Sequence, residues 1–166
     1  NPTDDEIAGI PLPVVVKPVD NRSSRGISVC RTGREIASGI EKALANSKSK
    51  KLIVEKYMTG DEVVIYYIIQ DGEPFLAGMC DRYTNKEQYG VAQLPTAYIF
   101  PSIYLKQYIH STDEKVKRML RDIGLQNGIL FIQSFVENGE VRFYEAGFRL
   151  NGAQEHYIVS AVSGID

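Results

Sequence analysis

The chain has 166 residues, of which 43% are hydrophobic and 24% are charged, a composition typical of one folded domain or of two small lobes. Its 19 Lys and Arg residues nearly balance 21 Asp and Glu residues, and the net charge of -2 excludes an overall basic surface, which argues against a nucleic-acid or membrane partner. Cys30 and Cys80 are too few for a disulfide framework or a thiolate metal site, which favours a reducing cytoplasm, and no apolar run approaches the ~20 residues of a membrane helix.

The first third of the chain predicts two strands, a helix and a further strand. Three consecutive valines stopped by Pro18 are typical of a short buried strand. Thr32 and Glu35 have the spacing of a capping box at the start of a helix with one apolar stripe. The expected elements are strands at 13–17, 27–30 and 52–57 and a helix at 33–46.

The rest of the chain is richer in strands. Asp71-Gly72 predicts a tight hairpin turn, and Ser111 with Glu114 predicts a second capping box. Residues 81–103 have no clear period and predict a long functional loop, opened by Asp81-Arg82 as a surface ion pair. The expected elements are strands at 61–70, 74–80, 129–136 and 140–145, and helices starting at Ser111 and at 151–162. This order favours an α+β fold with two lobes over a doubly wound sheet.

Two groups of residues in the first half are candidates for a nucleotide site. Lys17 ends a strand and is followed by a loop of small residues, a pattern that suits a phosphate cradle but equally suits a solvated lysine before a turn. Glu55 and Glu62 flank a predicted hinge between the lobes, where extended backbone and a carboxylate can bind an adenine or a ribose. The alternative is a pair of surface glutamates at strand ends.

A third group lies in the last hairpin. Gln133 and Glu145 alternate with apolar residues, and burying such polar groups without a partner costs about 2–7 kcal/mol for the amide alone. Mg²⁺ is one suitable partner and Arg149 is another. A two-residue Asn138-Gly139 turn would put Gln133 and Glu145 on opposite faces, whereas a three-residue turn that includes Glu137 would put them on the same face. We expect the three-residue turn.

Three segments together resemble a known family: PVVVKPVDNRSSRGISV, LIVEKYMTGDEV and FIQSFVENGEVRFYEAGFRLNG. In order and spacing they are similar to the ATP-grasp superfamily, in particular to the carbamoyl-phosphate synthase large chain, over about residues 11–160. The resemblance implies two α+β lobes with antiparallel-rich sheets and a nucleotide cleft between them. Residues 1–57 would form a small nucleotide-binding lobe with a phosphate flap, and residues 58–166 a larger lobe with a metal-binding hairpin.

The resemblance also implies roles for individual residues. It assigns Lys17 to the ATP phosphates, Ser23–Gly26 (with Ser24, Arg25 and Gly26) to a flap over them, Glu55 to the adenine, Lys56, Tyr57 and Met58 to the hinge, and Glu62 to the ribose. It assigns Gln133 and Glu145 to magnesium and Arg149 to the transferring phosphoryl group. Gly147 departs from the motif E-x-N-x-R, where the family carries a metal-binding Asn, so that either Asn151 substitutes or a second metal is held more weakly.

The resemblance implies an ATP- and Mg²⁺-dependent ligase, with Mn²⁺ as a possible replacement, that activates a carboxylate-type substrate as an acyl phosphate for attack by an amine. The partners would be small-molecule carboxylates and amines and an upstream domain of the same protein. Because the chain opens on NPTDDE and stops at SGID, we expect a fragment of a longer protein. Without the upstream domain that the resemblance implies, we expect this fragment to be inactive by itself. The alternatives are a nucleotide-binding module with degenerate or no catalysis, and an interaction domain that binds no nucleotide.

Overall fold

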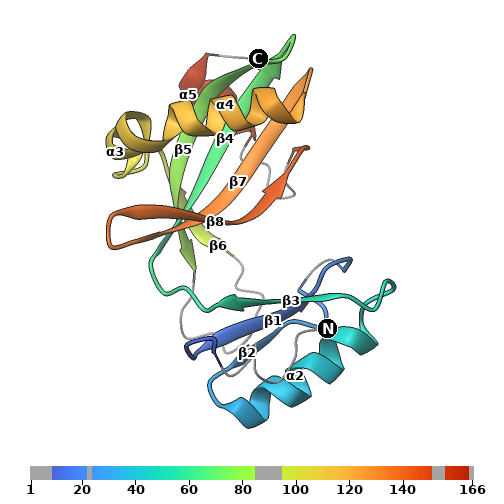
Figure 1. Cartoon of the computed structure of the whole chain (residues 1–166). Helices are drawn as coiled ribbons and strands as arrows, with labels where there is room; N and C mark the ends of the chain where they lie inside the picture. The colour runs from blue at the N-terminus through green and yellow to red at the C-terminus, as the bar shows by residue number, and fades with distance from the viewer. Residues whose placement is uncertain (1–8, 22–23, 85–94, 151–155, 165–166) are drawn as a thin grey trace. The chain divides into compact units, whose positions relative to one another are not determined.

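The computed structural model describes residues 9–21, 24–84, 95–150 and 156–164. These residues form two compact units, one up to Met58 and the other from Thr59 onward (Figure 1). Among the described helices, none is long and apolar enough to span a membrane. The α+β class and the antiparallel sheets expected from the sequence are confirmed, and each unit has its own core.

The first unit is a small antiparallel sheet covered by one helix. Its elements are β1 (Val14–Pro18), β2 (Ser28–Cys30), α2 (Gly33–Ala45) and β3 (Leu52–Lys56), with strand order β2-β1-β3. Val14 and Val16 are fully buried against Ile36 and Ala43 of α2, since alternate residues of a strand point to the same face. The intervening side chains of β1, including that of Lys17, therefore lie on the opposite face.

Helix α2 begins where its capping signal predicted. The Thr32 hydroxyl accepts a hydrogen bond from the Glu35 backbone N–H at 3.4 Å. The Glu35 carboxylate accepts one in return from the backbone N–H of Arg31 at 2.6 Å. The first bond satisfies a backbone donor of the first helical turn, and the second fixes the backbone just before the cap, so this helix start depends on local sequence.

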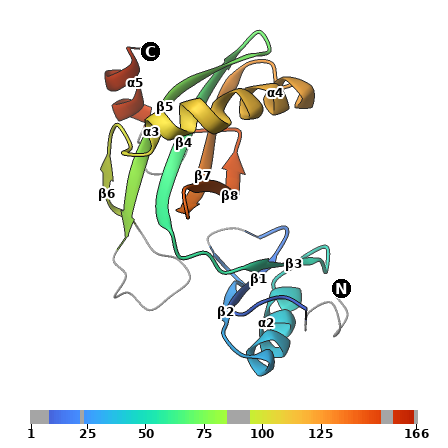
Figure 2. The same cartoon turned by 60° about the vertical axis from the view of Figure 1, so that its left-hand side comes forward.

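The second unit is a larger antiparallel sheet with strand order β6-β5-β4-β7-β8 (Figure 2). Its elements are β4 (Asp61–Gln70), β5 (Glu73–Thr84), β6 (Pro95–Ile99), α3 (Leu105–Tyr108), a π-helical turn η1 (Ile109–Asp113), α4 (Glu114–Ile123), β7 (Gly128–Glu137), β8 (Glu140–Gly147) and α5 (His156–Ser163). One face of the sheet packs beneath α3 and α4, where Tyr67 and Ile132 meet Tyr108 and Leu120. The other face, which we call the site face, carries a second cluster that includes Val64 and Phe131.

The long aperiodic loop predicted at 81–103 is wrong at both ends. Strand β5 continues to Thr84, and residues 95–99 form β6; residues 85–94 lie outside the described part of the chain. Asp81 is buried and accepts hydrogen bonds from the Ser102 hydroxyl at 2.5 Å and the Ile103 backbone N–H at 3.3 Å. The sequence of β5 shows no alternation of apolar and polar residues at this end, because enclosed polar side chains lie on both faces of the strand, Asp81 on one and Arg82 on the other.

Of the helix predicted at 151–162, residues from His156 onward are helical and 151–155 lie outside the described residues.

The helix predicted to start at Ser111 starts earlier, at Leu105. Ser111 lies inside the η1 turn, and its hydroxyl donates to the Gln107 carbonyl at 2.9 Å instead of capping a helix end. Tyr108, the last residue of α3 and directly before η1, is fully buried in the core beneath the helices. Burial of this aromatic side chain therefore extends the helix past a local start signal.

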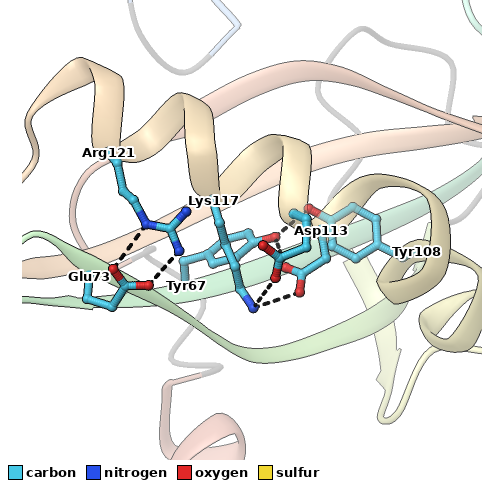
Figure 3. A network of polar contacts seen from close by, with 7 residues as sticks. Tyr67, Glu73, Tyr108, Asp113, Lys117 and Arg121 are labelled. Carbon is cyan, nitrogen blue, oxygen red and sulfur yellow. Dashed lines mark hydrogen bonds and ion pairs between the residues drawn. The ribbon is translucent and has the colours of Figure 1, made fainter.

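The helices are fixed to the sheet by a buried polar network (Figure 3). Asp113 accepts a hydrogen bond from the Tyr67 hydroxyl at 2.6 Å, and its other oxygen lies 2.9 Å from the Lys117 ammonium group. The hydroxyls of Tyr67 and Tyr108 are 2.7 Å apart. Burial raises the pKa of both tyrosines, so that they remain hydroxyl donors at any physiological pH. Every named group has a partner, which is the condition for keeping a carboxylate in a core.

We expect Asp113→Ala to lower the free energy of unfolding by about 2–4 kcal/mol, because it leaves the buried Tyr67 hydroxyl without its acceptor and removes the Asp113–Lys117 ion pair. The matched control is Glu114→Ala, since Glu114 also contacts Lys117 but is exposed, and should cost no more than ~0.5 kcal/mol. Urea denaturation measures both. Equal costs for the two variants would contradict a stabilising role for the network.

Candidate functional site

In the first unit, the structure brings together Lys17 and Glu55. Val15 pairs with Glu55 and Lys17 with Ile53, so that Lys17 and Glu55 lie diagonally on the face of the small sheet away from α2. The Lys17 Nζ atom is 2.5 Å from a Glu55 carboxylate oxygen. The side chains are 22% and 37% exposed, so both charges remain accessible to a ligand.

The predicted flap is partly described, with Ser23 outside the described residues. Ser24 and Gly26 have positive φ angles of 56° and 81°, and Arg25 between them is exposed. A Cβ atom on Gly26 would lie 2.7 Å from the Cβ of Asn46, so glycine is required there by both conformation and space. The end of the flap is therefore packed against the loop that follows α2.

The start of the flap is tied to the same loop. The Asp20 carboxylate accepts a hydrogen bond from the Ser49 backbone N–H at 2.6 Å, and the Asn21 side-chain amide donates to the Asn46 carbonyl at 2.8 Å. The bond from the Ser49 backbone, followed by the Ser47 hydroxyl, lowers the pKa of Asp20 to about 2. Both ends of the 20–26 segment thus have fixed attachments.

The predicted hinge residues follow one another at the end of the first unit. Lys56 is the exposed last residue of β3, and Tyr57 and Met58 after it are half-buried. The Tyr57 backbone N–H donates to the Pro13 carbonyl at 2.9 Å, which extends the β1–β3 pairing by one bond.

Glu62 lies on the site face of the second unit, in an enclosed ion pair. The register of β4 and β5 places it opposite Arg82, whose guanidinium contacts the Glu62 carboxylate. The two side chains are only 15% and 11% exposed. The Tyr144 hydroxyl also donates to Glu62, at 3.4 Å. The predicted surface ion pair of Asp81 with Arg82 is therefore wrong, and sequence analysis missed Arg82 and Tyr144 as neighbours of a candidate site residue.

The turn between β7 and β8 is the two-residue turn, so the prediction of a three-residue turn is wrong. Glu137 pairs with Glu140, and Asn138 and Gly139 have positive φ angles of 53° and 78°. These angles are typical of the turn that Asn-Gly favours. The turn is also held from α3, because the Gln107 side-chain amide contacts the Gly139 carbonyl.

A β-bulge nevertheless brings Gln133 and Glu145 to the same face. Ser134 pairs with Phe143 while Gln133 pairs with Glu145, which leaves Tyr144 as the extra residue of β8. Without it, the two-residue turn would set Glu145 opposite Ile132, on the face beneath the helices. Glu145 is exposed and Gln133 is half-buried, so the expectation of two polar groups buried among apolar side chains is wrong for Glu145.

Gly147 and Arg149 both contact Phe131. Gly147 pairs with Phe131, and a Cβ atom at position 147 would lie 2.4 Å from the ring. The ring therefore fills the space that any side chain at position 147 would need. The Arg149 guanidinium carbon is 5.1 Å from the centre of the same ring.

The pair Gln133 and Glu145 fits one hard cation that takes its other ligands from phosphate oxygens and water, as Mg²⁺ commonly does. Within the described ranges, no group of three or more His, Cys, Asp or Glu is arranged to hold a metal. A further donor from position 147 is excluded by Phe131, and Asn151, the other predicted ligand, lies outside the described residues.

Residues 10–154 match the model of the ATP-grasp domain, and the chain belongs to this family. It is 24% identical over 147 residues to the ATP-grasp enzyme fsqD of Aspergillus fumigatus, covering 82% of this chain and 25% of that protein. It is 25% identical over 163 residues to the carbamoyl phosphate synthase large chain of Clostridium beijerinckii, covering 97% of this chain and 15% of that protein.

The fold is similar to that of biotin carboxylase from Campylobacter jejuni, solved as a β-γ-ATP complex. The TM-score is 0.80 at 21% identity, covering 98% of this chain and 36% of the other. The chain thus spans about a quarter or less of the two curated relatives and about a third of this structure. The resemblance to ATP-grasp proteins and the expected fold are confirmed, whereas the roles of the site residues stay predictions.

We expect Gly147→Ala to lower the free energy of unfolding by about 1–3 kcal/mol, because its methyl group overlaps the Phe131 ring. Gly33→Ala is the matched control, since a Cβ at this first residue of α2 meets no atom within 4 Å. In a Phe131→Ala background the cost of Gly147→Ala should largely vanish, because the space is then open. Thermal or urea unfolding tests this, and an undiminished cost in that background would contradict the overlap.

The attachment of the flap predicts a pH dependence. The pKa of Asp20 is about 2 in the folded protein, below the 3.8 of an unperturbed group, so Asp20 stabilises the fold above pH ~4 and this contribution is lost as the pH falls towards 2. We expect Asp20→Asn to be less stable than the wild type at pH 7, with a difference that shrinks between pH 4 and pH 2. Urea denaturation at several pH values measures it, and a difference independent of pH would contradict the assignment.

Proposed function

We propose that this ATP-grasp chain is the nucleotide-binding part of a ligase that uses ATP and Mg²⁺ to activate a carboxylate-type substrate as an acyl phosphate, similar to the carbamoyl phosphate synthase large chain. The observation that carries the proposal is the Gln133–Glu145 pair, which lies on the same sheet face as Glu62 although a regular hairpin would separate its members. Mn²⁺ would serve as a replacement cation, since the same oxygen donors suit it.

In the first unit, the small lobe of the proposal, Lys17 would bind the ATP phosphates and Glu55 would accept a hydrogen bond from the adenine amine. Their ion pair holds the two charged groups on one open face, ready to exchange partners with a nucleotide. Ser24, Arg25 and Gly26 would cover the phosphates with backbone N–H groups and exclude water. Lys56, Tyr57 and Met58 would border the base, with the Tyr57 N–H already committed to Pro13.

In the second unit, the larger lobe of the proposal, the Glu62 carboxylate would accept a hydrogen bond from a ribose hydroxyl. Arg82 and Tyr144 support this role, because they hold the carboxylate in one orientation. Gln133 and Glu145, together with Asn151, would hold the cation, which when bound neutralises phosphate charge in the transition state. Arg149 would orient the transferring phosphoryl group with its N–H donors.

These residues would accelerate transfer by orientation and charge neutralisation alone. Lys17 and Arg149 would balance the charge that spreads over the phosphoryl oxygens while the substrate carboxylate attacks phosphorus and ADP leaves. The amine would then displace phosphate from the acyl phosphate. The carboxylate and amine pockets would lie largely in other parts of the protein, including an upstream domain, since the chain spans only part of its relatives. A cytoplasmic location agrees with the buried thiols of Cys30 and Cys80.

The alternative is a nucleotide-binding module with degenerate or no catalysis. Gly147 favours it, because Phe131 occupies the space of the family's side-chain donor. The discriminating experiment is Mg²⁺-dependent release of ADP from ATP by the full-length protein, screened with small carboxylates and amines. Release that requires one carboxylate supports the ligase, whereas nucleotide binding without release under any combination supports the alternative.

We expect Glu145→Gln to lower turnover at least ~100-fold in the full-length protein, because a cation ligand contributes several kcal/mol of transition-state stabilisation. Gln133→Ala should act in the same direction but less strongly, since a neutral ligand holds the ion less tightly. Stability should change little, because Glu145 is exposed. The control is Glu140→Gln, an exposed residue of the same strand paired with Arg142. Near-normal turnover of Glu145→Gln at saturating Mg²⁺ would contradict the metal assignment.

A further inference from the structure

We propose that Phe131 is a positioning residue for Arg149, and that Gly147 is glycine so that the ring can take this position. The inference rests on the proposed function only for the role of Arg149 towards phosphate. The contact itself is independent of any nucleotide. Its parts are a buried ring on β7, a glycine opposite it on β8, and an arginine two residues beyond.

The Phe131 ring is held from two sides. It is 2% exposed and belongs to the site-face cluster with Val64, Tyr66 and Cys80. On the side of β8, the missing side chain of Gly147 lets the ring lie across the backbone, with ring atoms 2.4 Å and 2.5 Å from where a Cβ would be. A ring packed in this way has one available orientation, so the face that Arg149 covers is a fixed platform.

Arg149 uses this platform. Its side chain is exposed, and a flexible exposed arginine would lose much rotamer freedom on binding an anion. The ring, 5.1 Å from the guanidinium carbon, attracts the positive charge and limits that freedom before a ligand arrives. One N–H donates to the Leu150 carbonyl at 2.8 Å, and the other guanidinium donors are left for a phosphoryl group.

The same geometry explains why this chain departs from its family's motif at position 147. A side chain there and the Phe131 ring need the same space, so the hairpin can carry a donor at position 147 or an aromatic platform for Arg149, but not both. This chain carries the platform. The guanidinium is then held over the Phe131 ring by packing instead of by a shared ligand set.

The contact is tested first without nucleotide, by NMR of the arginine side-chain N–H groups. The Arg149 signal, assigned by its loss in Arg149→Lys, should be displaced upfield by the ring current. Phe131→Leu should return it to the position of an exposed arginine such as Arg142, and Phe131→Tyr should keep it displaced. Thermal unfolding identifies any variant that fails to fold. An undisplaced wild-type signal, or one that Phe131→Leu leaves unchanged, would overturn the proposal.

The function of the contact is tested by calorimetric binding of MgATP and MgADP to the full-length protein. If Phe131 positions Arg149 for the terminal phosphoryl group, Phe131→Leu should weaken MgATP about three- to fivefold while MgADP stays unchanged, and Phe131→Tyr should restore the difference. Equal weakening of both nucleotides would indicate a merely structural role and overturn the proposal. Failure of the wild type to bind either nucleotide, with the Arg149 signal still displaced, would overturn the proposed function and with it the purpose of the contact.

Discussion

The geometry of the candidate site depends on one extra residue in β8. Strand pairing alternates side chains between two faces, and the Asn138-Gly139 turn fixes where that alternation starts. Tyr144 shifts the alternation by one position, and so moves Glu145 from the helix-covered face to the site face. The bulged residue is itself used, because its ring packs 5.0 Å from that of Phe135 and its hydroxyl reaches Glu62. The one extra residue, Tyr144, thus places Glu145 beside Gln133 and also contacts Glu62, the candidate ribose-binding carboxylate.

The site face combines fixed and exchangeable contacts. Arg82 with Glu62, and Phe131 with Gly147, are enclosed and have little freedom to move. Glu145 and Arg149 are exposed: strand register places Glu145, and Arg149 is held by the ring contact and by its hydrogen bond to the Leu150 carbonyl. This division suits a site that must present charged groups to a polyphosphate, since rigid neighbours orient them while solvent access keeps them available. The opposite face is fixed by the Asp113 network, which anchors the helices.

The sequence by itself determined what depends on neighbouring residues. Thr32 and Glu35 set the start of α2, and Asp71-Gly72 and Asn138-Gly139 set their turns, because the capping hydrogen bond and the positive φ angles of the turns involve only neighbouring residues. The family was evident from the order and spacing of three segments, which named Gln133 and Glu145 as a pair. No local signal marked Tyr144 as a bulge. Gln133 and Glu145 were therefore expected on one face because of a three-residue turn, whereas the bulge is what brings them together.

Tertiary structure decided what depends on packing between distant segments. The helical segment begins before Ser111 because burial of the Tyr108 ring stabilises it more than a capping hydroxyl at Ser111 would. Arg82 is enclosed because β4 and β5 place Glu62 opposite it, 20 residues away in the chain. In the sequence, Gly147 only lacks the metal-binding side chain of the family motif. In the fold, the Phe131 ring fills the space that a side chain at position 147 would need. Two side chains cannot occupy one volume, and only the folded chain shows which residues compete for it.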